Sequence, residues 1–381
     1  MSLLDFYEQA LTVLKQQGNY RQLTQYQQQG KWLTIASKRM LNLSSNDYLG
    51  LAEHSELKQK FFEQNESLMT SSSSRLLTGN FEEYTCLEST LSDAFQGRSA
   101  LLFNSGYHMN IGILPALCNS KTLILADKLI HASMIDGIRL SAATYVRYRH
   151  NDLNHLKQLI EKYHDDEIER IIVVTESVFS MDGDEADLHG LVALKQQFNK
   201  VMLYVDEAHA IGVRGQRGLG CAEQYAVIEH IDFLVGTFGK ALASVGGYLI
   251  CDEVIKLYLI NTMRPLVFST ALPPVNVAWT HFMFEQMQSM STQRQHLHQL
   301  SQDLKQQVVA KGYVCPSSSH LVPIVIGEND QTVQKSKQLQ DLGFYIMPVR
   351  PPTVPKHQAR LRISLTASIQ KQDVFDLVDI L

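Results

Sequence analysis

The chain has 381 residues, more than one hydrophobic core usually holds, so two or more lobes are expected. Its hydrophobic fraction of 45% and charged fraction of 19% are those of an ordinary globular protein, and a net charge of −5 without a long basic run argues against nucleic-acid binding. Apolar runs too short to span a membrane, an N-terminus without a signal-peptide pattern and five cysteines without a CxxC pair predict a cytoplasmic protein with no membrane or metal partner.

In chain order, residues 1–45 predict a helix followed by a short hairpin. From about residue 85, apolar and β-branched runs alternate with helix-like segments, which predicts a mainly parallel sheet of seven strands in a large α/β domain over 46–275. After a long polar-faced helix, three short strands predict a smaller α+β domain over 276–381. The seven runs lie at 99–103, 121–127, 143–148, 170–177, 201–208, 232–236 and 246–252.

Ligands of an open parallel sheet bind at the carboxyl ends of its strands, so the residues that follow each run are candidates for a site. Ser105 and Gly106 follow the first run and would begin a helix whose free N–H groups favour a phosphate. Taken singly, each candidate also has an ordinary structural explanation, such as a helix cap or an Asp-Gly turn. The later runs are followed by His131, Ser180, Asp182, Asp206, His209, Thr237 and Lys240.

Together, these residues place an anion-binding helix start, a carboxylate, two histidines and a lysine at one edge of the sheet. Pyridoxal phosphate needs this set: the helix start for its phosphate, the acid for its pyridine nitrogen and a lysine amine for its aldehyde. A desolvated lysine has a depressed pKa and is nucleophilic, which explains Lys240 in the apolar, glycine-rich stretch 232–249. Two competing phosphate motifs fail, because "GVRGQRGLG" has the wrong glycine spacing and no GxxxxGK[ST] occurs.

Ten sequence blocks also match a known family in their order and spacing. The chain resembles the α-oxoamine synthases, which belong to the fold-type-I pyridoxal-phosphate enzymes, and the resemblance runs almost end to end. The chain departs from the family pattern at residues 71–75, where the family often has glycine-rich sequence, at Tyr84, where its members commonly carry a histidine, and in "ALASVGGYL" after the lysine. The blocks are "LSSNDYLGL", "SSRLLTGN", "FNSGYHMN", "HASMIDG", "RHND", "TESVFSMDGD", "DEAHAIGVRGQRGLG", "TFGKA", "FSTALPP" and "ARLRISLTA".

The resemblance implies a role for each matching residue. Lys240 would bind the cofactor covalently and carry the proton, and Asp206 would hold the pyridine nitrogen. His209 would donate a hydrogen bond to the ring hydroxyl, and His131 would stack on the ring and contact substrate. The remaining matches are Gly106, Tyr107, Ser180 and Thr237 for the cofactor, Thr270 for the cofactor phosphate of a partner subunit in a homodimer, Asn46 and Arg362 for the amino-acid carboxylate, and Thr353 with Arg21 for the acyl substrate.

The segment "VRPPTVP" at 349–355 is similar to one found in the family members that act in biotin biosynthesis. It implies a decarboxylative condensation of L-alanine with a pimeloyl thioester, carried by CoA or by acyl carrier protein, to give 8-amino-7-oxononanoate. Within the family, glycine with acetyl-CoA or succinyl-CoA is the alternative, and this segment argues against it. An aminotransferase on the same fold and a non-catalytic scaffold are further alternatives, and the intact Lys240, Asp206 and His131 argue against the scaffold.

Overall fold

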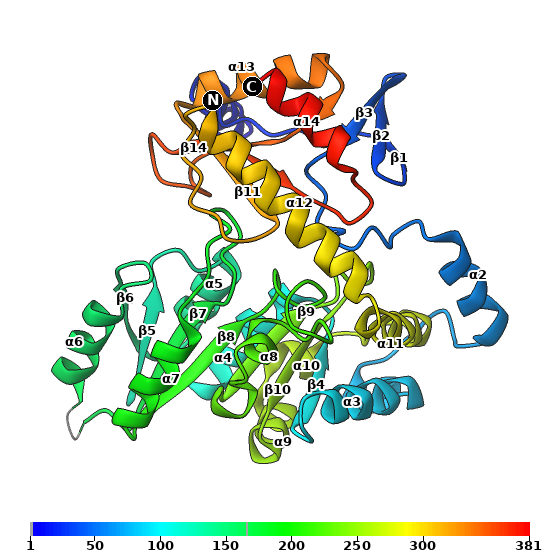
Figure 1. The fold of residues 1–381 in the computed structure, drawn as a ribbon. Helices are drawn as coiled ribbons and strands as arrows, with labels where there is room; N and C mark the ends of the chain where they lie inside the picture. The colour runs from blue at the N-terminus through cyan, green and yellow to red at the C-terminus, as the bar shows by residue number, and fades with distance from the viewer. Residues whose placement is uncertain (1–2, 165–166) are drawn as a thin grey trace. The chain divides into compact units, whose positions relative to one another are not determined.

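The structure is a computed structural model that describes residues 3–164 and 167–381 (Figure 1). The chain divides into two compact units, each of which is described by itself. The large unit comprises Asp47–Ser180 and Asp184–His296, and the small unit comprises Met1–Asn46, Met181–Gly183 and Leu297–Leu381. The three-part division at residues 45 and 275 stays a prediction. No helix in the described ranges is long and apolar enough to cross a membrane.

A seven-stranded sheet forms the centre of the large unit, which confirms the predicted fold class. The strand order is β4-β10-β9-β8-β7-β5-β6, and β10 runs antiparallel to both neighbours while the other pairs are parallel. The central runs lack apolar/polar alternation because helices cover both of their faces. The strands are β4 (Ser99–Phe103), β5 (Thr122–Asp127), β6 (Thr144–Tyr148), β7 (Arg170–Glu176), β8 (Val201–Asp206), β9 (Phe233–Thr237) and β10 (Gly247–Cys251).

Several helices of the large unit begin directly after a strand, with a side chain that caps their first turn. Ser105 accepts a hydrogen bond from the His108 N–H at the start of α4, and Asp152 accepts one from the His155 N–H at the start of α6. The helices are α2 (Ser55–Gln64), α3 (Glu82–Ala94), α4 (Gly106–Leu117), α5 (Ala132–Leu140), α6 (Leu153–Tyr163), α7 (Leu188–Gln197), α8 (Cys221–Gln224), α9 (Glu253–Thr262), α10 (Arg264–Phe268) and α11 (Pro274–Gln288), with short turns η1 (Arg75–Gly79) and η2 (Ile228–His230).

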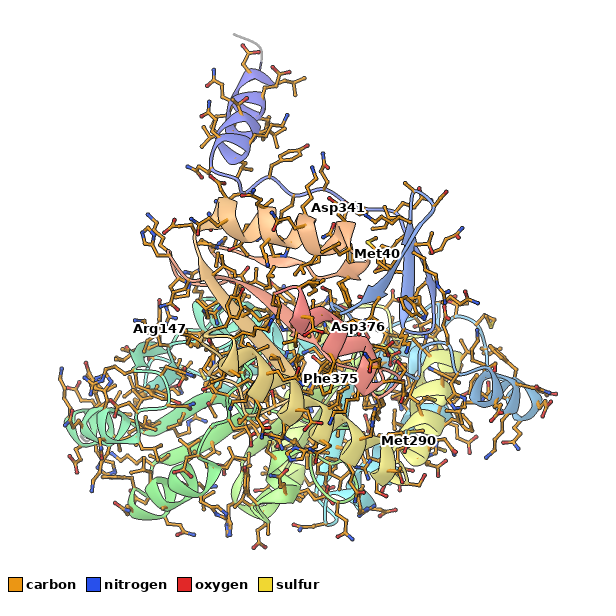
Figure 2. The ribbon with its side chains drawn as sticks, turned by 45° about the horizontal axis from the view of Figure 1, so that its top comes forward. Met40, Arg147, Met290, Asp341, Phe375 and Asp376 are labelled. Carbon is orange, nitrogen blue, oxygen red and sulfur yellow. The ribbon has the colours of Figure 1, made fainter. Side chains whose placement is uncertain are left out.

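The small unit contains two sheets, as expected for an α+β domain. Met40 of the first sheet, labelled in Figure 2, packs with Leu33 and Tyr345. The first sheet has the order β1 (Gln27–Gln29), β2 (Trp32–Ile35), β3 (Lys38–Asn42), β12 (Phe344–Tyr345), and the second has the order β11 (Leu321–Gly327), β14 (Ala359–Ser364), β13 (Pro348–Val349). Helices α1 (Asp5–Gln16), α13 (Asn329–Asp341) and α14 (Lys371–Asp379) complete the unit, and α12 (Ser291–Ala310) connects it to the large unit. Because β12 pairs with β3, the first 46 residues fold with the C-terminal segment.

Arg75 and Tyr84, which belong to two of the departures from the family pattern, contact each other. The Arg75 guanidinium lies 4.2 Å from the centre of the Tyr84 ring, and its Nη1 donates to Glu88 Oε1 at 2.8 Å. Lys256 donates to the other oxygen of Glu88 at 2.8 Å. The arginine, the tyrosine and the acid therefore form one packed group, in which the stacking and the ion pair stabilise the same arginine position.

Glu207 is a buried acid that directly follows β8 and holds the start of α8 in place. Its carboxylate accepts hydrogen bonds from the Ser177 hydroxyl at 2.6 Å and from the N–H groups of Cys221 and Ala222 at 2.9 and 2.7 Å. Burial raises its pKa to about 7. Gly220 precedes α8 with φ +108°, and a Cβ there would lie 2.6 Å from a Glu207 oxygen, so glycine is required.

We expect Glu207→Ala to lower the free energy of unfolding by about 3 kcal/mol, because it leaves two buried N–H donors without an acceptor. Urea unfolding of the apoprotein measures this loss. The matched control is Glu161→Ala on the exposed face of α6, which should change stability by less than about 0.5 kcal/mol. Equal stability of the two variants would contradict the role of Glu207.

Candidate active site

The carboxyl ends of β7, β8 and β9 and the first turns of α4 and α5 surround a cavity of about 200 Å³ within the large unit. Seven residues singled out from the sequence lie around it, together with six others that the sequence did not indicate. The first group is Gly106, Tyr107, His131, Asp206, His209, Thr237 and Lys240; the second is Met109, Asn110, Ser133, Glu176, Ala208 and Gly236. Residues that are spread over positions 106–240 of the chain therefore lie together at one edge of the sheet.

Asp206 ends β8, and its buried carboxylate is held from two sides. The Ala208 N–H donates to Oδ1 at 2.9 Å, and the Asn110 side-chain amide donates to Oδ2 at 3.1 Å. The Tyr204 hydroxyl donates to Asn110 Oδ1 at 2.5 Å, so the amide of Asn110 turns its NH₂ group toward Asp206. The carboxylate is thus fixed in one orientation at the cavity wall. Asn110 escaped sequence reasoning, although it lies in the "FNSGYHMN" block.

Lys240 is the first member of a hydrogen-bonded chain of three side chains. Its Nζ lies 2.9 Å from His209 Nε2, and His209 Nδ1 lies 2.6 Å from the Tyr48 hydroxyl. The two ring nitrogens are thus both hydrogen-bonded, one to the lysine and the other to the tyrosine, so the imidazole is held from two sides. Tyr48 therefore helps to fix the ring orientation of His209. The sequence block "LSSNDYLGL" contained Tyr48, but nothing in the pattern separated it from a core tyrosine.

The start of α4 offers a site for an anion. The N–H groups of Gly106 and Tyr107 belong to the first turn of this 12-residue helix, where no carbonyl of the helix itself can accept them. Thr237 lies beside Gly106, and its hydroxyl accepts the Gly239 N–H at 3.2 Å and donates to the Gly246 carbonyl at 2.8 Å. A phosphate at this position would gain backbone hydrogen bonds and the favourable end of the helix dipole.

His131 immediately precedes α5 and faces the cavity. Its Nδ1 lies 3.2 Å from the Ser133 N–H and 2.8 Å from the Ser133 hydroxyl. Because the backbone N–H can only donate, Nδ1 is an acceptor and the ring proton of a neutral His131 resides on Nε2. The cap of α5 therefore also fixes the plane of the imidazole at the cavity.

Glu176 is a second acid in the cavity that sequence reasoning missed. It ends β7, where the strand register pairs it with Asp206 on β8. Its Oε2 accepts the Ser180 N–H at 3.2 Å, whereas its buried Oε1 has no hydrogen-bond partner among the described residues. Burial and then the charge of Asp206 raise the pKa of Glu176 to about 8, so this side chain is a neutral acid at pH 7. The signal in the sequence was a carboxylate at the end of a buried run, as at Asp206.

The other residues expected from the sequence lie elsewhere. Ser180 is buried on the loop after β7, one hydrogen bond from Glu176 and outside the set that lines the cavity. Thr270 pairs through its backbone with Ser74, and its carbonyl accepts the Asn104 amide at 2.6 Å. In the small unit, Arg362 donates to Asn46 at 3.2 Å, and Arg21 and Thr353 line a second cavity. The roles of these residues stay predictions.

The cavity of the large unit fits pyridoxal phosphate. It offers N–H donors for a phosphate, a carboxylate for a pyridine nitrogen, an imidazole beside it and one lysine amine for the aldehyde. Glu176, which lines this cavity, adds a buried oxygen, Oε1, for which the described residues supply no hydrogen-bond donor. A lysine after β9 and a carboxylate at the end of β8 on this sheet define the class: a fold-type-I pyridoxal-phosphate enzyme.

Comparisons with known proteins agree with the geometry. The model of the aminotransferase class I and II family matches residues 38–381. An 8-amino-7-oxononanoate synthase of Haemophilus ducreyi is 56% identical over 385 residues, covering 98% of this chain and 99% of the relative. Among solved structures, serine palmitoyltransferase from S. paucimobilis with bound PLP–myriocin aldimine superposes with a TM-score of 0.90 at 26% identity, covering 100% of this chain and 97% of that one. An 8-amino-7-oxononanoate synthase from Francisella tularensis gives 0.77 at 26% identity, covering 90% and 96%.

The chain belongs to the aminotransferase class I and II family and, within it, to the α-oxoamine synthases, which are pyridoxal-phosphate-dependent acyltransferases. The resemblance stated from the ten sequence blocks is thereby confirmed, and so is the cofactor.

The raised pKa of Glu176 predicts a pH dependence of stability. Because the pKa of about 8 in the folded protein exceeds the ordinary value of 4.5, the stabilising contribution of the bound proton is complete below pH 4.5 and is lost as the pH rises through 8. Glu176→Gln has no such proton, so the variant should gain on the order of 2 kcal/mol relative to the native chain between pH 5 and 8.

Urea unfolding of both apoproteins at pH 5, 6.5 and 8 measures this gain. Glu161→Gln, at an exposed position of α6, should run parallel to the native chain over the same range. A difference between Glu176→Gln and the native chain that is constant with pH would show that Glu176 titrates as an ordinary acid.

Proposed function

We propose that the chain condenses L-alanine with a pimeloyl thioester to form 8-amino-7-oxononanoate, CO₂ and the free thiol, in biotin biosynthesis. The observation that carries this proposal is a cavity of about 220 Å³ in the small unit, which is lined by two arginines, Arg21 and Arg350, and by Pro351 and Thr353 of the segment "RPPTVP". The 56% identity to a relative named for this product supports it. The cavity is lined by Asn19, Arg21, Met181, Pro348, Val349, Arg350, Pro351 and Thr353.

The charges in this cavity suit an acyl chain that ends in a carboxylate. Arg350 donates to the Gly18 carbonyl, and both its burial and the neighbouring charge of Arg21 lower its pKa. Two cations close together are relieved by an anion between them, and a guanidinium binds a carboxylate through paired hydrogen bonds. A pimeloyl chain supplies such a carboxylate at its far end, whereas an acetyl group does not.

When bound, pyridoxal phosphate supplies an electron sink for the electrons of the Cα–H bond of an amino acid. We propose that Lys240 Nζ removes the α-proton of alanine and later returns a proton at the same carbon. Asp206, fixed by Asn110 and Ala208, holds the proton on the pyridine nitrogen by electrostatic preorganisation. His209 and His131 orient the ring, and the N–H groups at the start of α4 hold the phosphate.

The carboxylate of alanine is assigned to Arg362 and Asn46. Arg362 Nη2 donates to Asn46 Oδ1 at 3.2 Å, so the two side chains are already held together in the small unit. A planar guanidinium suits a carboxylate, and the amide adds a further donor. This pair serves alanine and glycine equally, so it does not by itself select the amino acid.

We further propose a homodimer in the cytoplasm, in which Ser269 and Thr270 of one chain reach the cofactor phosphate of the other. The turn that carries them is fixed by the backbone pairing of Ser74 with Thr270 and by Asn104. Sedimentation equilibrium tests the assembly: a single dimeric species is expected, and an active monomer would contradict the shared site.

The reaction is tested with purified holoenzyme, L-alanine and either pimeloyl-CoA or the pimeloyl carrier-protein thioester, with mass spectrometry of the product. We expect 8-amino-7-oxononanoate from at least one of the two thioesters and little condensation of glycine with acetyl-CoA. Efficient use of glycine with acetyl-CoA or succinyl-CoA and none of pimeloyl thioesters would assign the chain to another reaction of the family.

Arg350→Met should raise KM for the pimeloyl thioester at least about 10-fold with little change in kcat, because the ion pair is made in the substrate complex and in the transition state alike. A heptanoyl thioester, which lacks the terminal carboxylate, should show no such difference between the variant and the native enzyme. Lys356→Met, at the exposed position that directly follows this segment, is the control. An equal effect on both thioesters would show that Arg350 supports the fold rather than the carboxylate.

Asp206→Asn should lower kcat by about 10²- to 10³-fold, because an amide cannot keep the pyridine nitrogen protonated. Lys240 should still attach to the cofactor. Exchange of the α-proton of alanine in D₂O, followed by NMR, isolates the step in question. Exchange at the rate of the native enzyme would rule out this role for Asp206.

A further inference from the structure

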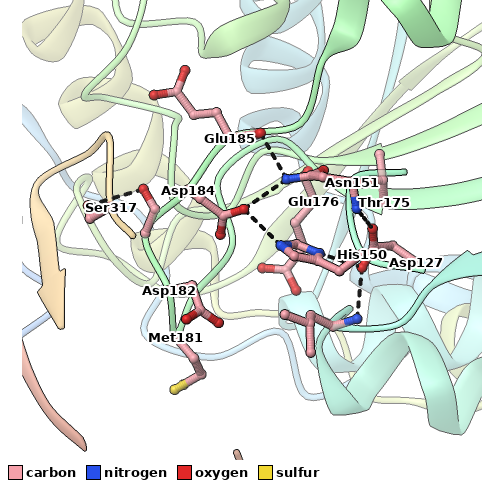
Figure 3. Close-up of polar contacts among 12 residues, drawn as sticks. Asp127, His150, Asn151, Thr175, Glu176, Met181, Asp182, Asp184, Glu185 and Ser317 are labelled. Atoms are coloured by element: carbon pink, nitrogen blue, oxygen red, sulfur yellow. Dashed lines mark hydrogen bonds and ion pairs between the residues drawn. The ribbon is translucent and has the colours of Figure 1, made fainter. Parts of the chain in front are cut away.

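The segment "RHND" after β6 contains a histidine that has no role in the proposed reaction. His150 Nδ1 lies 2.8 Å from Asp127 Oδ1, and His150 Nε2 lies 2.8 Å from Asp184 Oδ2 (Figure 3). All three residues belong to the large unit. Asp127 ends β5, His150 follows β6 and Asp184 lies on the turn after β7, so one imidazole connects the carboxyl ends of three strands.

Both ring nitrogens of His150 face acceptors, so both must carry a proton. Burial opposes this charge, but the hydrogen bonds and the negative charges of Asp127 and Asp184 outweigh it and raise the pKa of His150 to about 10. The Phe179 ring packs against the imidazole in a T-shaped arrangement, with the ring centres 4.5 Å apart. A cation with two charge-assisted hydrogen bonds is a stronger connection than a neutral imidazole could make.

The neighbouring Asn151 strengthens the same connection. Its N–H donates to Asp127 Oδ2 at 2.9 Å, and its side-chain amide donates to Asp184 Oδ2 at 2.8 Å and to the Glu185 carbonyl at 3.1 Å. Asn151 has φ +50°, a left-handed conformation that asparagine tolerates better than most residues. Two successive residues therefore bridge the same two aspartates.

The two aspartates each control a segment that reaches the cofactor cavity. Asp127 is fully buried and also accepts the Leu129 N–H at 2.8 Å, which shapes the short connection from β5 to His131. Asp184 closes the turn after β7, where its carbonyl accepts the Phe179 N–H at 2.9 Å. Ser180 lies inside this turn and donates to Glu176, which lines the cavity.

We propose that His150 is a positioning residue: by clamping Asp127 to Asp184 it holds the segment of His131 and the turn of Ser180 in the geometry that binds pyridoxal phosphate. His150 itself lines no part of the cavity, so it acts through its two partners. The proposal rests on the cofactor and not on the choice of amino acid or thioester, so it survives if the proposed substrates are wrong.

The test compares His150→Gln with His281→Gln. The two native side chains are similarly exposed, 25% and 27%, and His281 bonds Thr90 at 2.8 Å, away from the cofactor cavity. Glutamine keeps an uncharged NH₂ group that can donate to an aspartate, but it cannot carry the positive charge that faces both aspartates. For His150→Gln we expect apoenzyme to bind pyridoxal phosphate about 10-fold more weakly, the visible absorption band of the bound cofactor to shift, and kcat to fall about 10- to 100-fold. KM for alanine should change less than about 2-fold, and His281→Gln should match the native enzyme.

Asp184→Asn is the second variant, because it leaves the His150–Asp127 pair intact and changes only one atom type at a partly exposed site. It should weaken cofactor binding in the same direction, and the double variant with His150→Gln should lose less than the sum of the two single losses. If His150→Gln does not fold, the cofactor affinity of Asp184→Asn decides. Native cofactor affinity and absorption in the folded variants, even with a lower melting temperature, would reduce the clamp to a contribution to stability and overturn the proposal.

Discussion

The site depends on one electrostatic constraint: two buried carboxyl groups, Asp206 and Glu176, stand side by side at the ends of neighbouring parallel strands. A buried environment does not tolerate two adjacent negative charges, so one group must hold a proton. Asp206 has N–H donors directed at both of its oxygens, whereas burial and the neighbouring charge of Asp206 raise the pKa of Glu176 to about 8. Glu176 is therefore the group that holds the proton, and Asp206 remains the carboxylate that we propose for the ring nitrogen of the cofactor.

Further hydrogen bonds hold the other groups at the cavity in fixed orientations. Asn110 is oriented by Tyr204, His209 by Tyr48, and His131 by the cap of α5, so each group at the cavity is held by a second side chain or a backbone N–H. The clamp of His150 extends the same principle from side chains to the loops. Pre-organisation of this kind matters because a small misplacement of a reacting group costs far more in rate than in stability.

Much of the fold and part of the site could be predicted from the sequence. Strands β5, β7, β8 and β9 appear as apolar runs because both faces of the sheet are covered, and Lys240 is conspicuous because its surroundings are apolar. Glu176, Asn110 and Tyr48 could not be predicted as site residues, because their importance comes from strand register and from contacts between distant segments. Arg350 could not be predicted for the same reason, because Arg21, whose charge acts on it, is 329 residues away in the chain. The pairing of β3 with β12 gave no local signal in the sequence either.

The central claim is that Lys240 carries the cofactor. Reduction of the holoenzyme with borohydride, followed by proteolysis and mass spectrometry, fixes the cofactor on the amine to which it is attached and identifies that residue. The label is expected on the peptide containing "TFGKA", at Lys240, and nowhere else. A label on another lysine, or no label in a protein that retains the cofactor, would contradict it.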